Sequence, residues 1–107
     1  MIEVKATPKF MRLAKKAMTP EALQTLIDSL ALNPEQGVIV KDTRGIRKMR
    51  WMTGKGGDKR SGLRILYYFD GEYIVLLVTL FKKSDQENID AGEKTEIRKL
   101  IDELSRG

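Results

Sequence analysis

The spacing of apolar residues changes period twice along this chain. Between residues 10 and 30 the apolar side chains recur at intervals of three and four, which predicts amphipathic helices. Between residues 46 and 81 they alternate with polar residues or run together over short stretches, which predicts strands. Beyond residue 90 the helical interval returns. We therefore expect an α+β fold with an N-terminal helical hairpin, a sheet and a C-terminal helix.

Capping signals give the limits of these helices. Thr7-Pro8 and Thr19-Pro20 each place a hydroxyl before a proline, the pattern that begins a helix. Asn33-Pro34 ends the second helix. Asp90 and Glu93 have the spacing of a capping box, which predicts the start of the last helix.

Four segments have the pattern of strands: residues 2–4, 46–52, 63–69 and 73–81. The last is apolar almost throughout, which indicates a central strand buried on both sides. Asp70-Gly71 precedes it and predicts a two-residue type I′ hairpin turn, in which both central residues need a positive φ. We expect a curved antiparallel sheet with the helices packed mainly on one face.

Length and hydropathy limit the class of protein. The 107 residues provide for one domain, residues 1–107, with one modest core. No apolar run approaches the ~20 residues that a membrane-spanning helix needs. Glu3 stands where a signal peptide would carry positive charge, so we expect a cytoplasmic protein without membrane contact.

The chain contains no cysteine and no histidine. This excludes disulfides, thiolate nucleophiles and the usual zinc sites. It also removes the commonest general acid and base, so catalysis has to use Lys, Arg, Tyr, Asp, Glu or a hydroxyl group. We expect neither a metal ion nor a cofactor.

Positive charge is concentrated in one segment. The net charge of the chain is +5. Residues 41–64 alone carry +7, and the remaining residues carry −2. Such a concentration is typical of a site for a polyanion. The basic residues of this segment are Lys41, Arg44, Arg47, Lys48, Arg50, Lys55, Lys59, Arg60 and Arg64.

Strand alternation sorts part of this segment by face. Lys48 and Arg50 share one face of the strand at 46–52, and Met49 and Trp51 share the other, which we assign to the core. Arg64 begins the strand that the intervening loop makes the natural hairpin partner. Like charges at this density repel one another unless an anion offsets them. The alternative is a half-buried strand with a solvated charged face.

The loop at 53–62 contains four glycines and adds Lys55, Lys59 and Arg60. It lacks both the Gly-Lys-Ser/Thr ending of a phosphate loop and the third glycine of a dinucleotide fingerprint. We therefore expect no nucleotide cofactor, and a mobile basic loop that moulds itself to a nucleic acid.

Two further pairs complete the candidate site. Lys82-Lys83 directly follows the apolar strand, although taken alone the pair is better explained as a solubilising strand end. Tyr67 and Tyr68 lie on opposite faces of their strand, so one can serve the core while the other stacks on a base. We assign RNA binding to Arg47, Lys55, Lys59, Arg60, Lys82 and Tyr68.

In this order the features resemble the RelE superfamily, and within it the HigB and RelE toxins of bacterial type II toxin–antitoxin modules. The resemblance covers nearly the whole chain. The segments that carry it are Gly45 to Arg50, the glycine loop, Ser61 to Phe69, and the apolar strand that ends in Phe81-Lys82-Lys83-Ser84.

The resemblance implies a RelE/ParE-like fold and a toxin that cuts mRNA without a metal in the A site of the 30S ribosomal subunit. In such toxins the 2′-hydroxyl attacks the adjacent phosphorus, and cations stabilise the phosphorane. By position, Lys48 and Arg50 match the paired basic residues of the active strand. Arg64 matches the arginine of the next strand, and Lys83 the basic residue after the last one. A cognate antitoxin of the helix-turn-helix, HigA-like type is also implied.

The chain departs from the family pattern after Lys83. Some members have a tyrosine shortly after this position, whereas residues 84–89 contain none, so the general acid and base stay open. Three other functions remain compatible with the sequence: a ParE-like toxin that poisons DNA gyrase, a non-catalytic RNA-binding module, and an inactivated toxin that serves only as the partner of an antitoxin.

Overall fold

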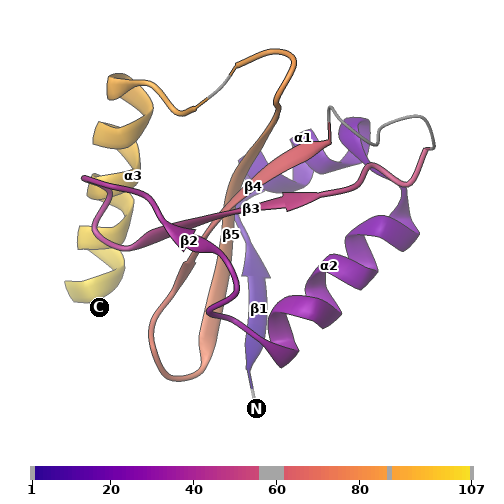
Figure 1. Ribbon diagram of the computed structural model, residues 1–107. Coiled ribbons are helices and arrows are strands. Elements are labelled where there is room, and N and C mark those ends of the chain that lie inside the picture. The colour runs from indigo at the N-terminus through magenta and orange to yellow at the C-terminus, as the bar shows by residue number, and fades with distance from the viewer. Residues whose placement is uncertain (1, 56–61, 87, 107) are drawn as a thin grey trace.

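The computed structural model describes residues 2–55, 62–86 and 88–106 (Figure 1). Strands and helices follow one another in the order expected, with one additional short strand, β2. The elements are β1 (Glu3–Ala6), α1 (Pro8–Ala17), α2 (Pro20–Leu32), β2 (Val38–Ile39), β3 (Ile46–Trp51), β4 (Leu63–Phe69), β5 (Ile74–Lys82) and α3 (Ala91–Arg106).

All three predicted helix starts are confirmed by hydrogen bonds. The Thr7 hydroxyl accepts from the Phe10 amide at 3.0 Å. Thr19 caps α2 in the same way, with the Ala22 amide at 3.1 Å. Asp90 accepts from the Glu93 amide at 2.8 Å, and the Glu93 carboxylate accepts from the Asp90 amide at 3.4 Å, which completes the capping box.

The described strands form one five-stranded sheet in the order β1-β5-β4-β3-β2. Strands β3 to β5 pair antiparallel, as predicted, and the additional strand β2 pairs antiparallel with β3. The expected sheet was antiparallel throughout, but β1 joins the outer side of β5 in parallel. A parallel neighbour is possible here because the long chain from α1 to β4 separates the two strands. The sequence did not indicate β2, because two residues are too few to show a period.

The predicted type I′ turn at Asp70-Gly71 is wrong. Gly71 has a φ of +87°, but among the described residues other than glycine only Asp42 and Arg44 have a positive φ. Instead, the Asp70 carboxylate accepts from the amides of residues 72, 73 and 74 at 2.8, 2.9 and 3.0 Å. This side-chain turn lengthens the connection, and β5 begins one residue later than predicted.

Helices cover both faces of the sheet, two on one side and one on the other (Figure 1). On one face, α1 and α2 pack on β4 and β5 around the fully buried Phe10, Leu26 and Tyr67. On the other face, α3 packs its Ile97 and Ile101 against residues of β3, β4 and β5. The prediction that the helices lie mainly on one face therefore holds for α1 and α2, and α3 is the exception.

Trp51 at the end of β3 packs against the core between the sheet and the helices α1 and α2, as predicted. Its indole N–H donates to the Ala22 carbonyl at 2.8 Å. Within the described segments, no helix has the length and apolar character needed to cross a membrane.

Candidate functional site

The pairing of β3 with β4 brings three predicted cations to one face of the sheet. Lys48 lies opposite Leu66, and Arg50 lies opposite Arg64. Residues directly opposite each other in an antiparallel pair project to the same side. Leu66 belongs to the core beneath α3, so the three cations lie on the α3 side of the sheet.

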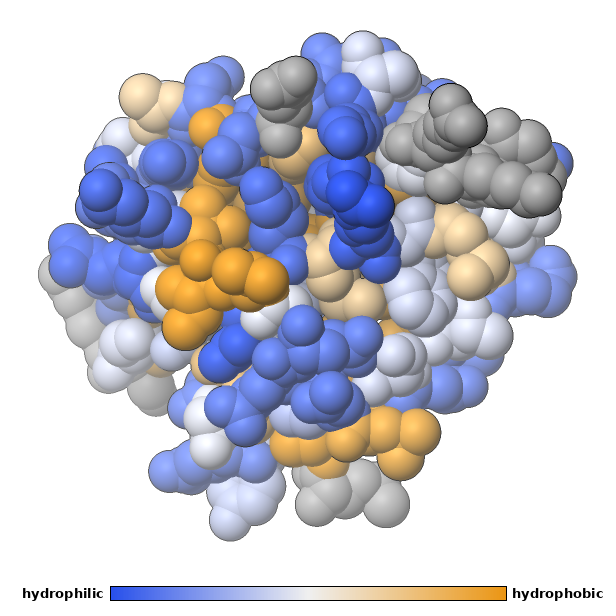
Figure 2. All heavy atoms as spheres, in the orientation of Figure 1, coloured by the Kyte–Doolittle hydropathy of each residue, from blue (hydrophilic) through white to orange (hydrophobic). Residues whose placement is uncertain are grey.

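These side chains line a hollow of about 660 Å³, which we call the basic hollow. Lys83 reaches it from the turn after β5, where its amide donates to the Gly62 carbonyl at 3.4 Å. All four residues that we predicted to act on the phosphate therefore line one concave site. Figure 2 shows hydrophilic side chains over β3, beside an apolar patch over β2. The lining consists of Gln36, Val38, Lys48, Met49, Arg50, Arg64 and Lys83.

Arg64 is the most enclosed cation of the site, with 8% of its surface exposed. Its guanidinium donates one hydrogen bond to a described residue, to the Leu63 carbonyl at 3.4 Å. Burial lowers the pKa of Arg64 from its ordinary value, and the positive charge of Arg50 lowers it further. A guanidinium in this position still has several N–H donors for an oxyanion.

The positive charges of the basic hollow are not neutralised by any described carboxylate. The ion pairs of the described residues all lie elsewhere: Lys5–Glu3, Arg44–Asp102 and Arg47–Glu35. Among the described residues, the Lys48 ammonium donates to the neutral side chain of Asn88, with Nζ 3.5 Å from Oδ1. Uncompensated cations at this density favour an anionic ligand, and arginine binds phosphate through paired N–H donors.

Arg47 was predicted to bind RNA, but the structure places it away from the basic hollow. It lies opposite the buried Tyr67 and so projects to the α1–α2 side of the sheet. Its guanidinium donates to the carbonyls of Glu35 and Gly37 at 3.0 and 2.8 Å. It also lies 3.6 Å from the Glu35 carboxylate, with its side chain 18% exposed. Arg47 therefore fixes the segment before β2, and we do not assign it to the site.

The other predicted RNA contacts are also separate from the hollow where the structure describes them. The Lys55 ammonium donates to the Lys16 carbonyl near the end of α1 at 2.7 Å. Lys82 borders a depression on the α1 side. Tyr68 packs against the apolar core between the sheet and α3, which leaves its ring less free to stack on a base. Lys59 and Arg60 lie outside the described residues. For this group, RNA binding stays a prediction.

Sequence reasoning missed Gln36 and Val38, which line the basic hollow. The segment that carries them is held by Tyr67, whose hydroxyl accepts from the Gly37 amide at 2.8 Å and donates to the Pro34 carbonyl at 2.8 Å. Burial raises the pKa of the Tyr67 hydroxyl, although the hydrogen bond from Gly37 acts in the opposite direction. The one signal in the sequence was the apolar pair Val38-Ile39 beside a charged segment.

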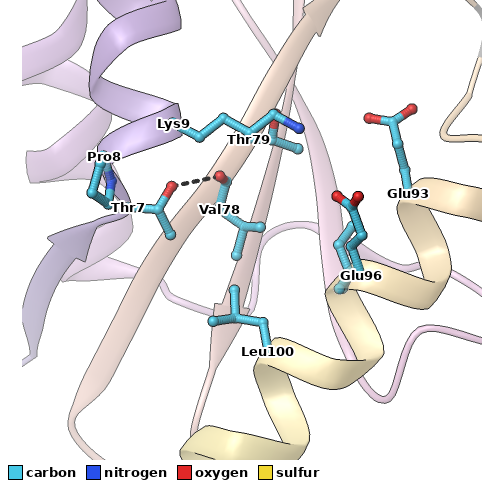
Figure 3. Close-up of a pocket in the computed structure, with 9 residues that line it drawn as sticks. Thr7, Pro8, Lys9, Val78, Thr79, Glu93, Glu96 and Leu100 are labelled. Carbon is cyan, nitrogen blue, oxygen red and sulfur yellow. Dashed lines mark hydrogen bonds between the residues drawn. The ribbon is translucent and has the colours of Figure 1, made fainter.

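A second cavity, of about 330 Å³, lies between the start of α1, β5 and α3 (Figure 3). The Thr7 hydroxyl donates to the Val78 carbonyl at 2.7 Å along one wall. Glu93 and Glu96 project from α3 on the opposite side (Figure 3). The two carboxylates outnumber the one cation of this lining, Lys9, which disfavours a phosphate, so this cavity does not extend the basic hollow.

The chemistry open to the basic hollow is binding of a phosphate and stabilisation of charge that develops on it. Three of its cations lie on paired strands, so their backbone positions are set before a ligand arrives. In the segments that the structure describes, no three carboxylate, histidine or cysteine groups come together as metal ligands.

Comparison with known proteins identifies the fold. No protein-family model matches this sequence. Among solved structures, a double mutant of the E. coli toxin RelE in the free state is similar, with a TM-score of 0.56 and 14% sequence identity. The match covers 80% of this chain and 87% of the RelE chain. This chain therefore has a RelE-like fold, as the sequence motifs implied.

Proposed function

We propose that this chain is a toxin of a bacterial type II toxin–antitoxin module, of the RelE and HigB type. It acts in the cytoplasm as an endoribonuclease that cuts mRNA in the ribosomal A site and so inhibits translation. The observation that carries the proposal is the basic hollow, where Lys48, Arg50, Arg64 and Lys83 meet without a described carboxylate partner. The RelE-like fold supports it.

The proposed reaction is transesterification within the RNA. The 2′-oxygen forms a bond to the adjacent phosphorus, the bond to the 5′-oxygen breaks, and the products carry a 2′,3′-cyclic phosphate and a 5′-hydroxyl. Negative charge increases on the phosphoryl oxygens in the transition state. Arg50 and Arg64 stabilise this charge, because the pairing of their strands places them side by side before the RNA binds.

One proton leaves the 2′-hydroxyl and one is delivered to the 5′-oxygen. Arginine stays protonated in proteins, so Arg50 and Arg64 act as donors to the phosphate and not as bases. Of the four cations, Lys48 and Lys83 are therefore the ones able to exchange protons. This assigns proton transfer to lysine in a chain that has no histidine and no tyrosine at residues 84–89.

An antitoxin that neutralises this protein has to counter the positive charge of the basic hollow. We propose a cognate partner of the helix-turn-helix, HigA-like type that either covers the basic hollow with acidic residues or blocks access to the ribosome by its bulk. In both cases co-expression of the two proteins restores growth. A stable complex that leaves growth arrest unchanged would contradict the proposal.

The experiment is induction of the protein in cells, followed by mapping of mRNA 5′ ends and a parallel assay for DNA breaks. The proposal predicts new 5′-hydroxyl ends within translated frames, and their loss in the Arg50→Gln variant. Intact transcripts with accumulated DNA breaks would favour the gyrase-directed alternative. Intact transcripts and intact DNA would favour an RNA-binding module or an inactive toxin.

A further inference from the structure

The lining of the basic hollow includes one exposed aliphatic side chain, that of Val38, among its charged residues. Val38 lines the hollow and is 74% exposed, and its neighbour Ile39 is 56% exposed. Both belong to β2, the outer strand of the sheet on this side. The apolar patch beside the hydrophilic side chains in Figure 2 lies over this strand. An exposed aliphatic residue gains nothing from a phosphate, so it fits a different part of the ligand.

Gln36 lines the same hollow, and its side-chain nitrogen is hydrogen-bonded to the end of α2. Its Nε2 lies 3.1 Å from the Ser29 carbonyl, 3.0 Å from the Ser29 hydroxyl and 3.1 Å from the Asn33 carbonyl. Carbonyl oxygens can only accept, so the amide nitrogen has to face them. The side-chain oxygen then occupies the other branch of the amide, and no described residue donates to it.

The positions of these two residues are fixed by the buried core. Tyr67 is fully buried, and its hydroxyl bonds to Pro34 and Gly37 on either side of Gln36. A Cβ added at Gly37 would lie 2.9 Å from the Tyr67 ring and hydroxyl, which shows how closely the segment is seated. An acceptor and an apolar surface held in this way are preorganised for one ligand orientation.

We propose that Gln36 and Val38 form a base-reading subsite beside the phosphate site, an inference that rests on the proposed function. A base packs its face on Val38 and donates its amino group to the Gln36 side-chain oxygen. Adenine and cytosine carry this amino group at C6 and C4, whereas guanine and uracil present a carbonyl oxygen at the equivalent position, which repels another acceptor. The expected ligand is therefore single-stranded RNA with adenine or cytosine next to the bound phosphate.

The hollow itself favours RNA over a protein partner. Cations able to bind phosphate, the apolar Val38 and the uncharged Gln36 line it together. RNA alternates charged phosphates with bases that have apolar faces and polar edges. An acidic protein segment would use the cations but would leave the acceptor of Gln36 without a donor of defined position.

Two substitutions separate base reading from the structural role of Gln36. Gln36→Leu removes both the acceptor and the donor that binds Ser29 and Asn33. Gln36→Lys keeps a donor for those oxygens but has no acceptor. Both variants should reduce the preference for adenine over uracil by about 3- to 10-fold, the value of one hydrogen bond. Gln24→Leu is the control, because Gln24 is exposed on α2 and bonds to Asp28.

Val38→Thr tests the apolar surface with a side chain of the same shape. It should weaken binding of adenine and uracil oligonucleotides alike, by a few-fold, because the base face and not its edge is affected. Leu32→Thr is the control, since Leu32 is 88% exposed and does not line the hollow.

The measurement is NMR titration of the whole protein with tetraadenylate and with tetrauridylate, alongside mapping of cleavage sites in cells. We expect tetraadenylate to shift the Gln36 side-chain amide and the Val38 methyl signals and to bind more tightly. Equal affinities with an unmoved Gln36 signal would overturn the subsite even if the protein cuts mRNA. Selective shifts without mRNA cleavage would support the subsite and refute the nuclease. If Val38→Thr leaves the RNA shifts unchanged but weakens antitoxin binding, the patch belongs to a protein partner and the inference fails.

Discussion

Arg50 and Arg64 lie directly opposite each other on the antiparallel pair of β3 and β4. Like charges in this position destabilise a sheet. No described carboxylate forms an ion pair with either residue, and burial of Arg64 makes the repulsion harder for water to screen. The pair is therefore a cost to the free protein, and a phosphate bound between the two side chains would relieve it.

Removing one member of this pair should stabilise the free protein. Arg50→Gln is expected to raise the free energy of unfolding by about 0.5 kcal/mol, because the exposed Arg50 takes no part in the core. Urea unfolding at low ionic strength measures the change. Lys41→Gln, at an exposed position outside the hollow, should leave stability within experimental error. A loss of stability in Arg50→Gln would show that the pair is not repulsive.

A second consequence is selective stabilisation by oxyanions. Sulfate should raise the melting temperature of the protein more than chloride does at equal ionic strength, because it binds the folded hollow and not the unfolded chain. Sulfate also strengthens burial in general, so the Arg50→Gln variant is the reference. The difference between the two salts should shrink in this variant. An equal difference in both proteins would mean that no anion binds at the pair.

Tyr67 links the core to the wall of the hollow, and its hydroxyl should contribute to stability. Tyr67→Phe leaves the buried Gly37 amide without its acceptor and is expected to cost about 1–3 kcal/mol. Urea unfolding at neutral pH provides the test. The matched control is Tyr73→Phe, because Tyr73 is 62% exposed in the turn before β5.

The same residue predicts a pH dependence. Burial raises the pKa of Tyr67 above its ordinary value of 10.0, so the folded state favours the protonated hydroxyl. Its contribution is fully present below pH 10.0 and is lost as pH rises through the folded value. Wild type should therefore lose more stability than Tyr67→Phe on the alkaline side. Parallel losses in both proteins would contradict this assignment.

Much of this arrangement could be predicted from the sequence, and particular residues show which parts could not. Period-two alternation placed Lys48 and Arg50 on one face, and the hairpin placed Arg64 beside them. The same alternation puts Arg47 on the core side with Met49, a consequence that a charge count overlooks. The position of Tyr68 depended on which face α3 covers, and an amphipathic stripe does not specify its partner. Asp70 replaced a backbone turn by a side-chain turn, which dipeptide signals do not distinguish.

Gln36 and Val38 were beyond sequence reasoning for a different reason. The strand β2 has two residues and exists because β3 provides its hydrogen-bond partners, with Val38 opposite Lys48. Its place beside the cations depends on Tyr67, which binds the Gly37 amide from 30 residues further along the chain. Local patterns carry no trace of such a contact.

Single-turnover cleavage of mRNA on programmed ribosomes tests the central claim most directly. At saturating ribosome concentration, Arg50→Gln should bind but cut more slowly by on the order of 100-fold, since it lacks one contact to the transition state. Arg12→Gln, on the exposed side of α1, should cut at the wild-type rate. Because Arg50→Gln is expected to be more stable than wild type, misfolding cannot account for its loss. Cleavage by Arg50→Gln at the wild-type rate once bound would contradict the placement of catalysis in the basic hollow.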